Sequence, residues 1–226
     1  MATTARPRTT EAPRRPATAR TQEERQAQSD AAMASAAVAL ICERGAAATT
    51  LKDVGVRAGY SRGLAGYRFG SKAGLWSFLV RTIGEEWREE LRGAVAGTSG
   101  VATLHAALDA HCRMLVRSPD RIRAFYVLWF DSVGPDPALR AQIERIHDRR
   151  RRDVERWIAD GVAAGTVRGD ADVTAVAEQF VAQIVGVVYE WLVADPDAHD
   201  AARVSQRHED LKRQMTRALA PDPDKE

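Results

Sequence analysis

The sequence predicts an all-α protein in which a small N-terminal domain of three helices precedes a larger helical bundle. Apolar residues recur every three or four positions through most of the chain, whereas no segment alternates between apolar and polar residues as a half-buried strand does. Glycine and proline interrupt this pattern at intervals that suit helices of ordinary length. A length of 226 residues allows one large domain or two modest ones, and a hydrophobic content of 45% is enough for a core.

The chain begins with residues 1–22, which are rich in Thr, Ala, Pro and Arg and carry a net charge of +4. Such a segment buries too little apolar surface to offset its lost conformational entropy, so we expect a disordered basic arm. A helix should follow from about residue 26 to residue 44. Its apolar stripe consists of Met33, Ala36, Ala37, Leu40 and Ile41.

Residues 45–72 predict two short helices joined by a tight turn. Thr50 is placed to cap the first helix, because its hydroxyl can accept a hydrogen bond from the amide of Asp53. Gly59 follows, where only a residue without a Cβ turns the chain cheaply through a positive φ, and Ser61 can cap the second helix. Two helices linked in this way form a helix-turn-helix, whose second helix enters the major groove of DNA.

The charge distribution agrees with a nucleic-acid partner. Residues 45–72 carry a net charge of +4, as the arm does, whereas the whole chain carries only +2. All other residues therefore sum to −6. Charge alone does not exclude a solvated pair of surface helices, so the prediction depends on the helix pattern and the charge together.

An ordered series of residue types runs through residues 30–80. It consists of Ala36-Ala37, Leu40, Gly45, Thr49-Thr50-Leu51, Asp53-Val54, Ala58-Gly59, Ser61, Gly63, Phe69, Ser71-Lys72 and Leu75. This series resembles the DNA-binding domain of the TetR family of transcriptional regulators. The family's usual Leu-Tyr pair falls on Ala65-Gly66, the usual His or Tyr before the Phe is Arg68, and the usual Glu after the Lys is Ala73. We expect Tyr67 to take the phosphate-contacting role.

The resemblance implies a homodimeric, ligand-responsive regulator on an inverted-repeat operator in double-stranded DNA, and we expect it to be a repressor, although the sequence does not distinguish repression from activation. We expect the DNA contacts to come from the helix-turn-helix and its flanks, namely Thr49, Thr50, Lys52, Arg62, Gly63, Leu64, Tyr67, Arg68 and Lys72. The arm either adds phosphate or minor-groove contacts or is an inert tail. The alternative is a helical small-molecule-binding or scaffold protein whose head, altered at Ala65-Gly66, no longer binds a specific operator.

We expect the DNA-binding domain to span residues 23–72 and a helical ligand-binding and dimerisation domain to span residues 73–226. Ser71 should cap a long helix that runs to about residue 92, which is long enough at ~1.5 Å per residue to connect two domains. Further helices are predicted at about 101–117, from 119 to the turn at 134–137, and at 137–164, 172–193 and 200–219. This pattern predicts a helical bundle.

The interior faces of these helices carry aromatic residues and a few polar-tipped ones. A plain core explains an aromatic stripe, but the resemblance implies a ligand cavity among the fourth to eighth helices. The candidate ligand-binding residues are His105, Phe125, Tyr126, Trp129, Arg150, Trp157 and Phe180. Because every interior stripe is aliphatic or aromatic, the effector should be a small and largely apolar molecule.

Arg150 lies in the middle of the apolar stripe of the helix at 137–164. A buried charge without a partner costs several kcal/mol, so Arg150 needs an anion. The anion is either an internal carboxylate, such as Asp109, Asp131 or Glu190, or an acidic ligand. Only in the second case is the effector acidic.

The helix at 172–193 is apolar on more than half of its circumference. One face can fill the core of the subunit while its flank meets a second subunit. We therefore expect this helix and the one at 200–219 to form a four-helix interface about a two-fold axis. The candidate interface residues are Val185, Tyr189, Val204, His208, Leu211 and Met215.

Other classes of function have little support. The sequence has no glycine-rich phosphate loop, and His105 and Cys112 lie seven residues apart, about 10 Å along a helix and too far for one metal ion. We therefore expect no enzymatic activity, no cofactor and no metal. Cys42 and Cys112 form no disulfide framework, which suits a reducing cytoplasm. We expect no signal peptide and no membrane span of ~20 apolar residues.

Overall fold

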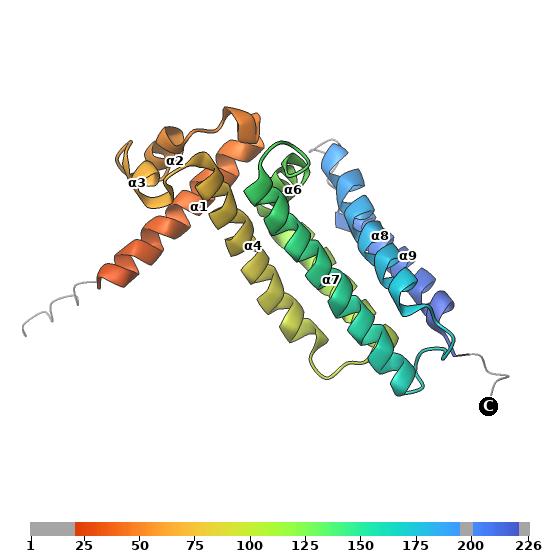
Figure 1. Ribbon diagram of the computed structural model, residues 1–226. Coiled ribbons are helices and arrows are strands. Elements are labelled where there is room, and N and C mark those ends of the chain that lie inside the picture. Colours follow the sequence, from red (N-terminus) through yellow and green to blue (C-terminus); the bar gives the residue numbers. More distant parts are fainter. Residues whose placement is uncertain (1–20, 195–200, 222–226) are drawn as a thin grey trace, which may run out of the picture.

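A computed structural model describes residues 21–194 and 201–221. Within these residues all regular secondary structure is α-helical, which confirms the predicted fold class. The helices are α1 (Gln22–Ala48), α2 (Leu51–Arg57), α3 (Leu64–Phe69), α4 (Lys72–Val95), α5 (Gly100–Arg117), α6 (Pro119–Asp131), α7 (Pro137–Ala163), α8 (Val173–Val193) and α9 (Ala201–Leu219). Helices α1 to α3 form a head at one end, and α4 runs from the head along the bundle of α5 to α9 (Figure 1). The predicted arm lies outside the described residues, apart from residues 21 and 22.

Local capping sets both ends of α1. Thr21 and Glu24 form a capping box, in which the Thr21 hydroxyl accepts from the Glu24 amide at 3.2 Å and the Glu24 carboxylate accepts from the Thr21 amide at 2.8 Å. This box starts the helix at Gln22, earlier than the predicted residue 26. Near the other end Gly45, with a φ of 81°, breaks the helical path.

The turn of the helix-turn-helix follows the predicted chemistry in two of three respects. Thr50 caps α2 by accepting from the Asp53 amide at 3.2 Å, and Gly59 has a φ of 81°, both as predicted. The predicted cap at Ser61 is wrong, because α3 begins only at Leu64 and no side chain caps it. The Ser61 backbone carbonyl instead accepts from the Leu64 amide at 3.2 Å, which closes the turn without the hydroxyl.

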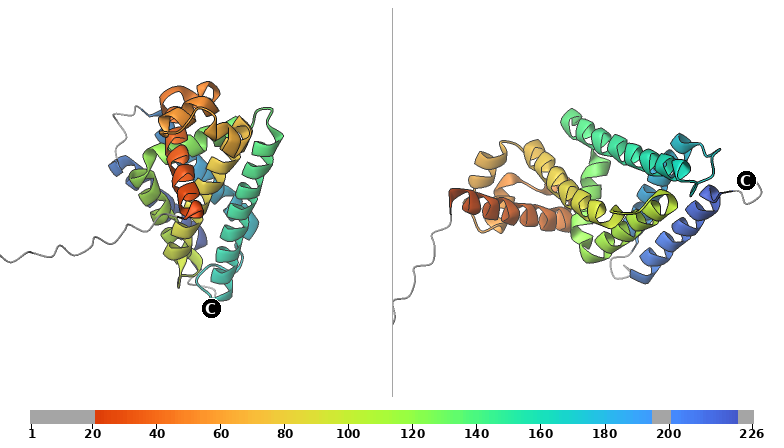
Figure 2. Two further views of the ribbon diagram at one scale, coloured as in Figure 1. Left: turned by 90° about the vertical axis from the view of Figure 1, so that its left-hand side faces the viewer. Right: turned by 90° about the horizontal axis from the view of Figure 1, so that it is seen from below.

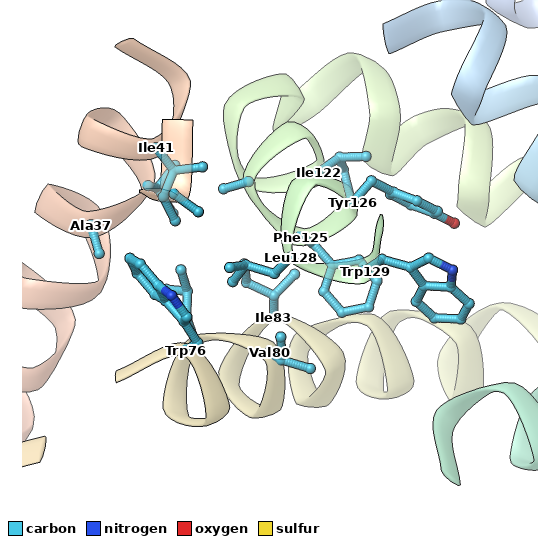
Figure 3. Close-up of a cluster of buried hydrophobic side chains, with 14 of the residues drawn as sticks. Ala37, Ile41, Trp76, Val80, Ile83, Ile122, Phe125, Tyr126, Leu128 and Trp129 are labelled. Atoms are coloured by element: carbon cyan, nitrogen blue, oxygen red, sulfur yellow. The ribbon is translucent and has the colours of Figure 1, made fainter. Parts of the chain in front are cut away.

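One hydrophobic core joins the head to the bundle, and Figure 3 shows side chains of α1, α4 and α6 meeting in it. Ile41 of α1 and Trp76 of α4 both lie at the α1 end of the cluster, and Leu128 of α6 points toward them. All three side chains are buried. Because this core continues through α4 into the bundle, a displacement of α4 or α6 is transmitted to the head.

A second core lies between α5, α7, α8 and α9. Helix α9 packs on α5 of the same chain (Figure 2). As a result Val204, His208, Leu211 and Met215 are each at most 5% exposed. The prediction that these four residues meet a second subunit is therefore wrong, because packing within the chain already covers them.

Helices α5 and α7 approach each other closely at two glycines. A Cβ on Gly161 would lie 2.6 Å from the Gly100 Cα and 2.6 Å from the Val167 Cγ2. We expect Gly161→Ala to lower the free energy of unfolding by roughly 1–3 kcal/mol, because the backbone has to move apart. Urea denaturation followed by circular dichroism measures this change. Gly93→Ala is the control: a Cβ there meets nothing within 4 Å, so it should be neutral or stabilising by up to ~1 kcal/mol, and equal losses in both variants would contradict the argument.

Two of the described helices, α1 and α8, are long and apolar enough by composition to cross a membrane, which the sequence analysis did not expect. Core helices of soluble proteins meet the same criterion. The apolar side of α1 packs on α2 and α6, whereas α8 leaves Tyr189 and Val193 exposed on its outer face. The exposed side of α8 therefore carries apolar surface that packing among the described residues does not cover.

Neither cysteine forms a disulfide. Burial raises the pKa of the Cys42 thiol to about 11, and its Sγ lies 3.4 Å from the Asp120 carbonyl oxygen, to which it donates. Burial also raises the pKa of Cys112. Both side chains therefore stay protonated near neutral pH and act as small packing residues.

Candidate DNA-binding surface and ligand cavity

The head exposes a cationic surface on α2, the turn and α3. Tyr67 on α3 is 90% exposed, and Lys52, Arg62 and Gly63 are exposed beside it. We call these four residues the recognition surface. Neither Lys52 nor Arg62 pairs with a carboxylate among the described residues, whereas the nearby Arg57 pairs with an acid of α1. The positive charge of the recognition surface is therefore available to phosphates or base edges.

Three other predicted DNA contacts lie at the edge of this surface or beneath it. Thr49 is fully buried, and its hydroxyl donates to the Gly45 carbonyl at 2.9 Å, so the prediction that it contacts DNA is wrong. Thr50 is exposed, and its hydroxyl donates to the Asp53 carboxylate at 2.7 Å. Leu64 is half-buried against the hydrophobic core of the head.

Arg68 and Lys72 bind other parts of the head. The Arg68 guanidinium donates to both carboxylate oxygens of Asp30, at 2.7 and 2.6 Å, which ties α3 to α1. The Lys72 ammonium donates to the Ala47 carbonyl at 2.6 Å and lies 5.7 Å from the centre of the Trp76 ring. In this structure both cations hold the helices of the head together, and the arginine that replaces the family's usual His or Tyr has an intramolecular partner.

A cavity of about 340 Å³ lies between α4, α5, α6, α7 and α8. This volume is in the range of small-molecule sites. Its apolar lining comes mainly from Trp87, Met114, Phe125, Trp157 and Phe180. Its charged lining comprises Arg81, Arg88, Arg145, Arg149 and Arg150 with Glu85 and Asp153. The excess of arginine makes the cavity attractive to an anion.

Arg150 lies against the aromatic wall of α6. Its guanidinium carbon is 5.0 Å from the Trp129 ring centre and 5.9 Å from the Phe125 ring centre, and its Nη1 donates to the Tyr126 hydroxyl at 3.4 Å. Figure 3 shows Tyr126 and Trp129 pointing away from α1, on the far side of α6. No carboxylate of the described residues forms an ion pair with Arg150.

Two of the three internal carboxylates that could have neutralised Arg150 have other partners, and the third, Asp131, is exposed and forms no ion pair with it. Asp109 pairs with Lys212, and Glu190 pairs with Arg207 at 3.2 Å. Within the described residues the guanidinium is thus stabilised by aromatic faces rather than by an anion. Of the two alternatives left open by the sequence, the geometry favours an anion that enters the cavity.

The other predicted ligand-binding residues divide into two groups. Phe125, Tyr126, Trp157 and Phe180 line the cavity together with Arg150. Two more do not line it: Trp129 lies beneath the guanidinium, and His105 faces α9. The predicted role of His105 is wrong, because its Nε2 hydrogen-bonds Thr216 Oγ1 at 3.0 Å and the Lys212 carbonyl at 3.2 Å.

The histidine that does line the cavity is His111, which the sequence analysis missed. Its Nδ1 lies 2.9 Å from the Nε2 of His208, and the His208 Nδ1 lies 2.8 Å from the Val204 carbonyl oxygen. Burial lowers the pKa of His111 well below its usual range, and the charges of His208 and Arg150 lower it further. His111 lies seven positions after the buried Leu104, a helical spacing that could have identified it.

A helix-turn-helix head joined to a helical bundle with a cavity between its helices defines a ligand-responsive DNA-binding regulator. Residues 34–77 match the family described as "Bacterial regulatory proteins, tetR family", and residues 124–206 match "Tetracyclin repressor-like, C-terminal domain". Together these matches cover more than half of the chain, which belongs to the TetR family of transcriptional regulators. Members of this family are not enzymes; they bind DNA operators and small-molecule effectors and form dimers.

Solved structures share the fold at low sequence identity. A TetR transcriptional regulator from Chloroflexus aurantiacus J-10-FL is 22% identical with a TM-score of 0.73, covering 88% of this chain and 99% of its own. The MbdR regulator from Azoarcus sp. CIB is 21% identical with a TM-score of 0.70, covering 84% and 98%. SmeT in its complex with triclosan is 21% identical with a TM-score of 0.67, covering 86% and 93%. No curated protein sequence matches the chain.

Proposed function

We propose that this chain is a homodimeric repressor that binds an inverted-repeat operator and releases it when a largely apolar acid enters the cavity. Residues 23–72 read the operator, and residues 73–226 bind the ligand and the second subunit. The protein acts in the cytoplasm, where its operator lies. The similarity of its fold to SmeT, which has been solved with triclosan, supports a small-molecule ligand.

Arg150 is the observation that carries the acidic character of the ligand. A guanidinium has five N–H donors in a planar fork, and in the described residues only the 3.4 Å contact to the Tyr126 hydroxyl uses one of them. A carboxylate is the anion whose two oxygens match this fork. Because the remaining wall of the cavity is mainly aromatic and aliphatic, the rest of the ligand is apolar.

The second subunit covers the outer face of α8. Tyr189 is 54% exposed, and its ring meets that of Phe130, itself 41% exposed, with 6.0 Å between ring centres. Val133, which follows Phe130 by three residues, and Val193, which follows Tyr189 by four, are also exposed. We call these four residues the outer apolar patch, which with the half-buried Val185 replaces the inner face of α9 as the proposed dimer contact.

The experiment that tests the proposal measures DNA binding and its release together. Fluorescence anisotropy with labelled duplex from the DNA flanking the protein's own gene should give a dissociation constant of roughly 10⁻⁸ M or tighter at physiological salt. Decanoic acid, as a probe of an apolar acid, should release the DNA, and decanol should not. Binding no tighter than to random duplex would contradict the proposal and favour the alternative of a head without a specific operator.

The packing around Ala65 supports a head that still binds a specific operator. Ala65 is fully buried in the head, where α2 and α3 pack closely around Gly55. A Cβ on Gly55 would lie 2.8 Å from the Ser61 carbonyl oxygen. The small residue at position 65 therefore fits a close contact between the two helices, and α3 still presents Tyr67 to solvent.

The recognition surface contains one candidate for base readout and one for phosphate contact. We expect Arg62→Ala to relax specificity at one base position by about 1–3 kcal/mol, because a bidentate arginine discriminates guanine from other bases. We expect Tyr67→Ala to weaken binding by a similar factor on every sequence, because phosphates carry no sequence information. Anisotropy titrations against a panel of single-base operator variants separate the two effects. Unchanged discrimination by the Arg62→Ala protein would remove Arg62 from the base-reading role.

A further inference from the structure

His111 provides the cavity with a hydrogen-bonding group whose tautomer is set by residues behind it. The Val204 carbonyl oxygen can only accept, so the His208 Nδ1, 2.8 Å away, carries a hydrogen. Burial lowers the pKa of both histidines, which keeps them neutral near pH 7. In neutral His208 the Nε2 is then an acceptor. The His111 Nδ1, 2.9 Å from it, must donate.

These linked hydrogen bonds place the hydrogen of His111 on its Nδ1. The Nε2 of His111 therefore has no hydrogen and is an acceptor. Within the described residues His111 has only the hydrogen bond to His208, so no protein donor meets this second nitrogen. The side chain is 6% exposed and lines the cavity, and its ring packs edge-on against Trp87 with 5.7 Å between ring centres. An acceptor on a ring held on two sides is a fixed feature of the cavity wall, and a donor inside the cavity is needed to satisfy it.

We propose that His111 selects ligands that carry a hydroxyl or N–H donor in addition to the acidic group that meets Arg150. The inference deepens the proposed function and rests on it. Both residues line the same cavity, and the charge of Arg150 reaches His111, since it contributes to lowering the pKa of that histidine. The two groups require different partners on the ligand: the guanidinium only donates and needs an acceptor, whereas this nitrogen only accepts and needs a donor. The ligand is therefore a hydroxylated or N–H-bearing apolar acid rather than a plain one.

Isothermal titration calorimetry of the full-length protein with ten-carbon acids tests this selection. The probes are decanoic acid, its positional hydroxy isomers, and the O-methyl ether of each isomer, which keeps the oxygen and removes the donor. We expect at least one hydroxy isomer to bind about tenfold tighter than decanoic acid, as one buried hydrogen bond allows. Its methyl ether should lose that advantage, because it has no hydrogen to donate.

Two variants assign the preference to His111. His111→Phe keeps an aromatic ring beside Trp87 and removes the acceptor, and His111→Phe/His208→Leu also removes the polar partner that the first change leaves unsatisfied. Both should still bind decanoic acid, which shows that the cavity is intact, but should bind the hydroxy isomer no tighter than decanoic acid. A tenfold preference that persists in a variant that binds decanoic acid overturns the inference.

The failures of the two proposals differ in the wild-type protein. Binding of decanoic acid with no preference for any hydroxy isomer overturns the role of His111 and leaves the proposed function standing. Binding of no acid at all overturns the acid-responsive function and this inference with it.

Discussion

Arg150→Met should raise the concentration of an apolar acid that releases operator DNA by about 10- to 150-fold while leaving operator binding unchanged. Methionine fills the space between the aromatic rings of α6 but cannot donate a hydrogen bond. The wild-type side chain has no carboxylate partner among the described residues, so its removal leaves no internal charge stranded. A charged hydrogen bond is worth about 1.5–3 kcal/mol, so the affinity for decanoic acid should fall roughly 10- to 150-fold.

The control for this experiment lies two residues along the same helix. Arg152 is exposed and does not line the cavity, so Arg152→Met removes the same charge without touching the ligand. Its release curve with decanoic acid should match that of the wild type. If the Arg150→Met protein were released at the original concentration of decanoic acid, the acid-sensing role of Arg150 would be lost.

Features that depend on neighbouring residues were predictable from the sequence. The Thr50 cap and the positive φ of Gly59 follow from the chemistry of a single turn, and Ser71 caps α4 as predicted, accepting from the Gly74 amide at 3.0 Å. The cap at Ser61 failed because the structure closes that turn through the backbone carbonyl instead. Local hydrogen bonding thus determines helix ends well, except where the backbone offers a competing partner.

The buried face of a helix was harder to predict where the helix itself carries small residues around its circumference. In α5 the alanines widen the apolar surface, so a stripe through His105 and a stripe through His111 fit the same periodicity. The structure buries the stripe through His111, and His111 then forms a 2.9 Å hydrogen bond with His208 on α9. A contact between residues 97 positions apart leaves no local signal in the sequence.

The identity of a partner was the least predictable property. The stripe of α9 was correctly identified as buried, but periodicity cannot distinguish burial against α5 from burial against another subunit. Arg68 likewise looked like a DNA contact until its distance to Asp30 was known. For Arg150 the sequence predicted a charged partner, whereas the structure surrounds the guanidinium with aromatic rings.

Tyr189→Asp should convert the dimer into a monomer and thereby abolish specific operator binding. The outer apolar patch is the surface that we propose the second subunit covers, and Tyr189 lies within it in contact with Phe130. Burying a carboxylate there without a partner costs several kcal/mol, so the dissociation constant of the dimer should rise at least about 100-fold. A monomer contacts only one half of an inverted repeat and loses the joint contribution of the second half.

Val116→Asp provides the matched control, because Val116 is about as exposed as Tyr189, at 50% against 54%, but lies on α5. Sedimentation velocity at micromolar concentration should show a monomer for Tyr189→Asp and a dimer for Val116→Asp, and anisotropy should show operator binding only for the second. Circular dichroism should show both variants to be equally helical, since each changes one exposed side chain. A Tyr189→Asp protein that sediments as a dimer and binds the operator normally would place the interface elsewhere on the bundle.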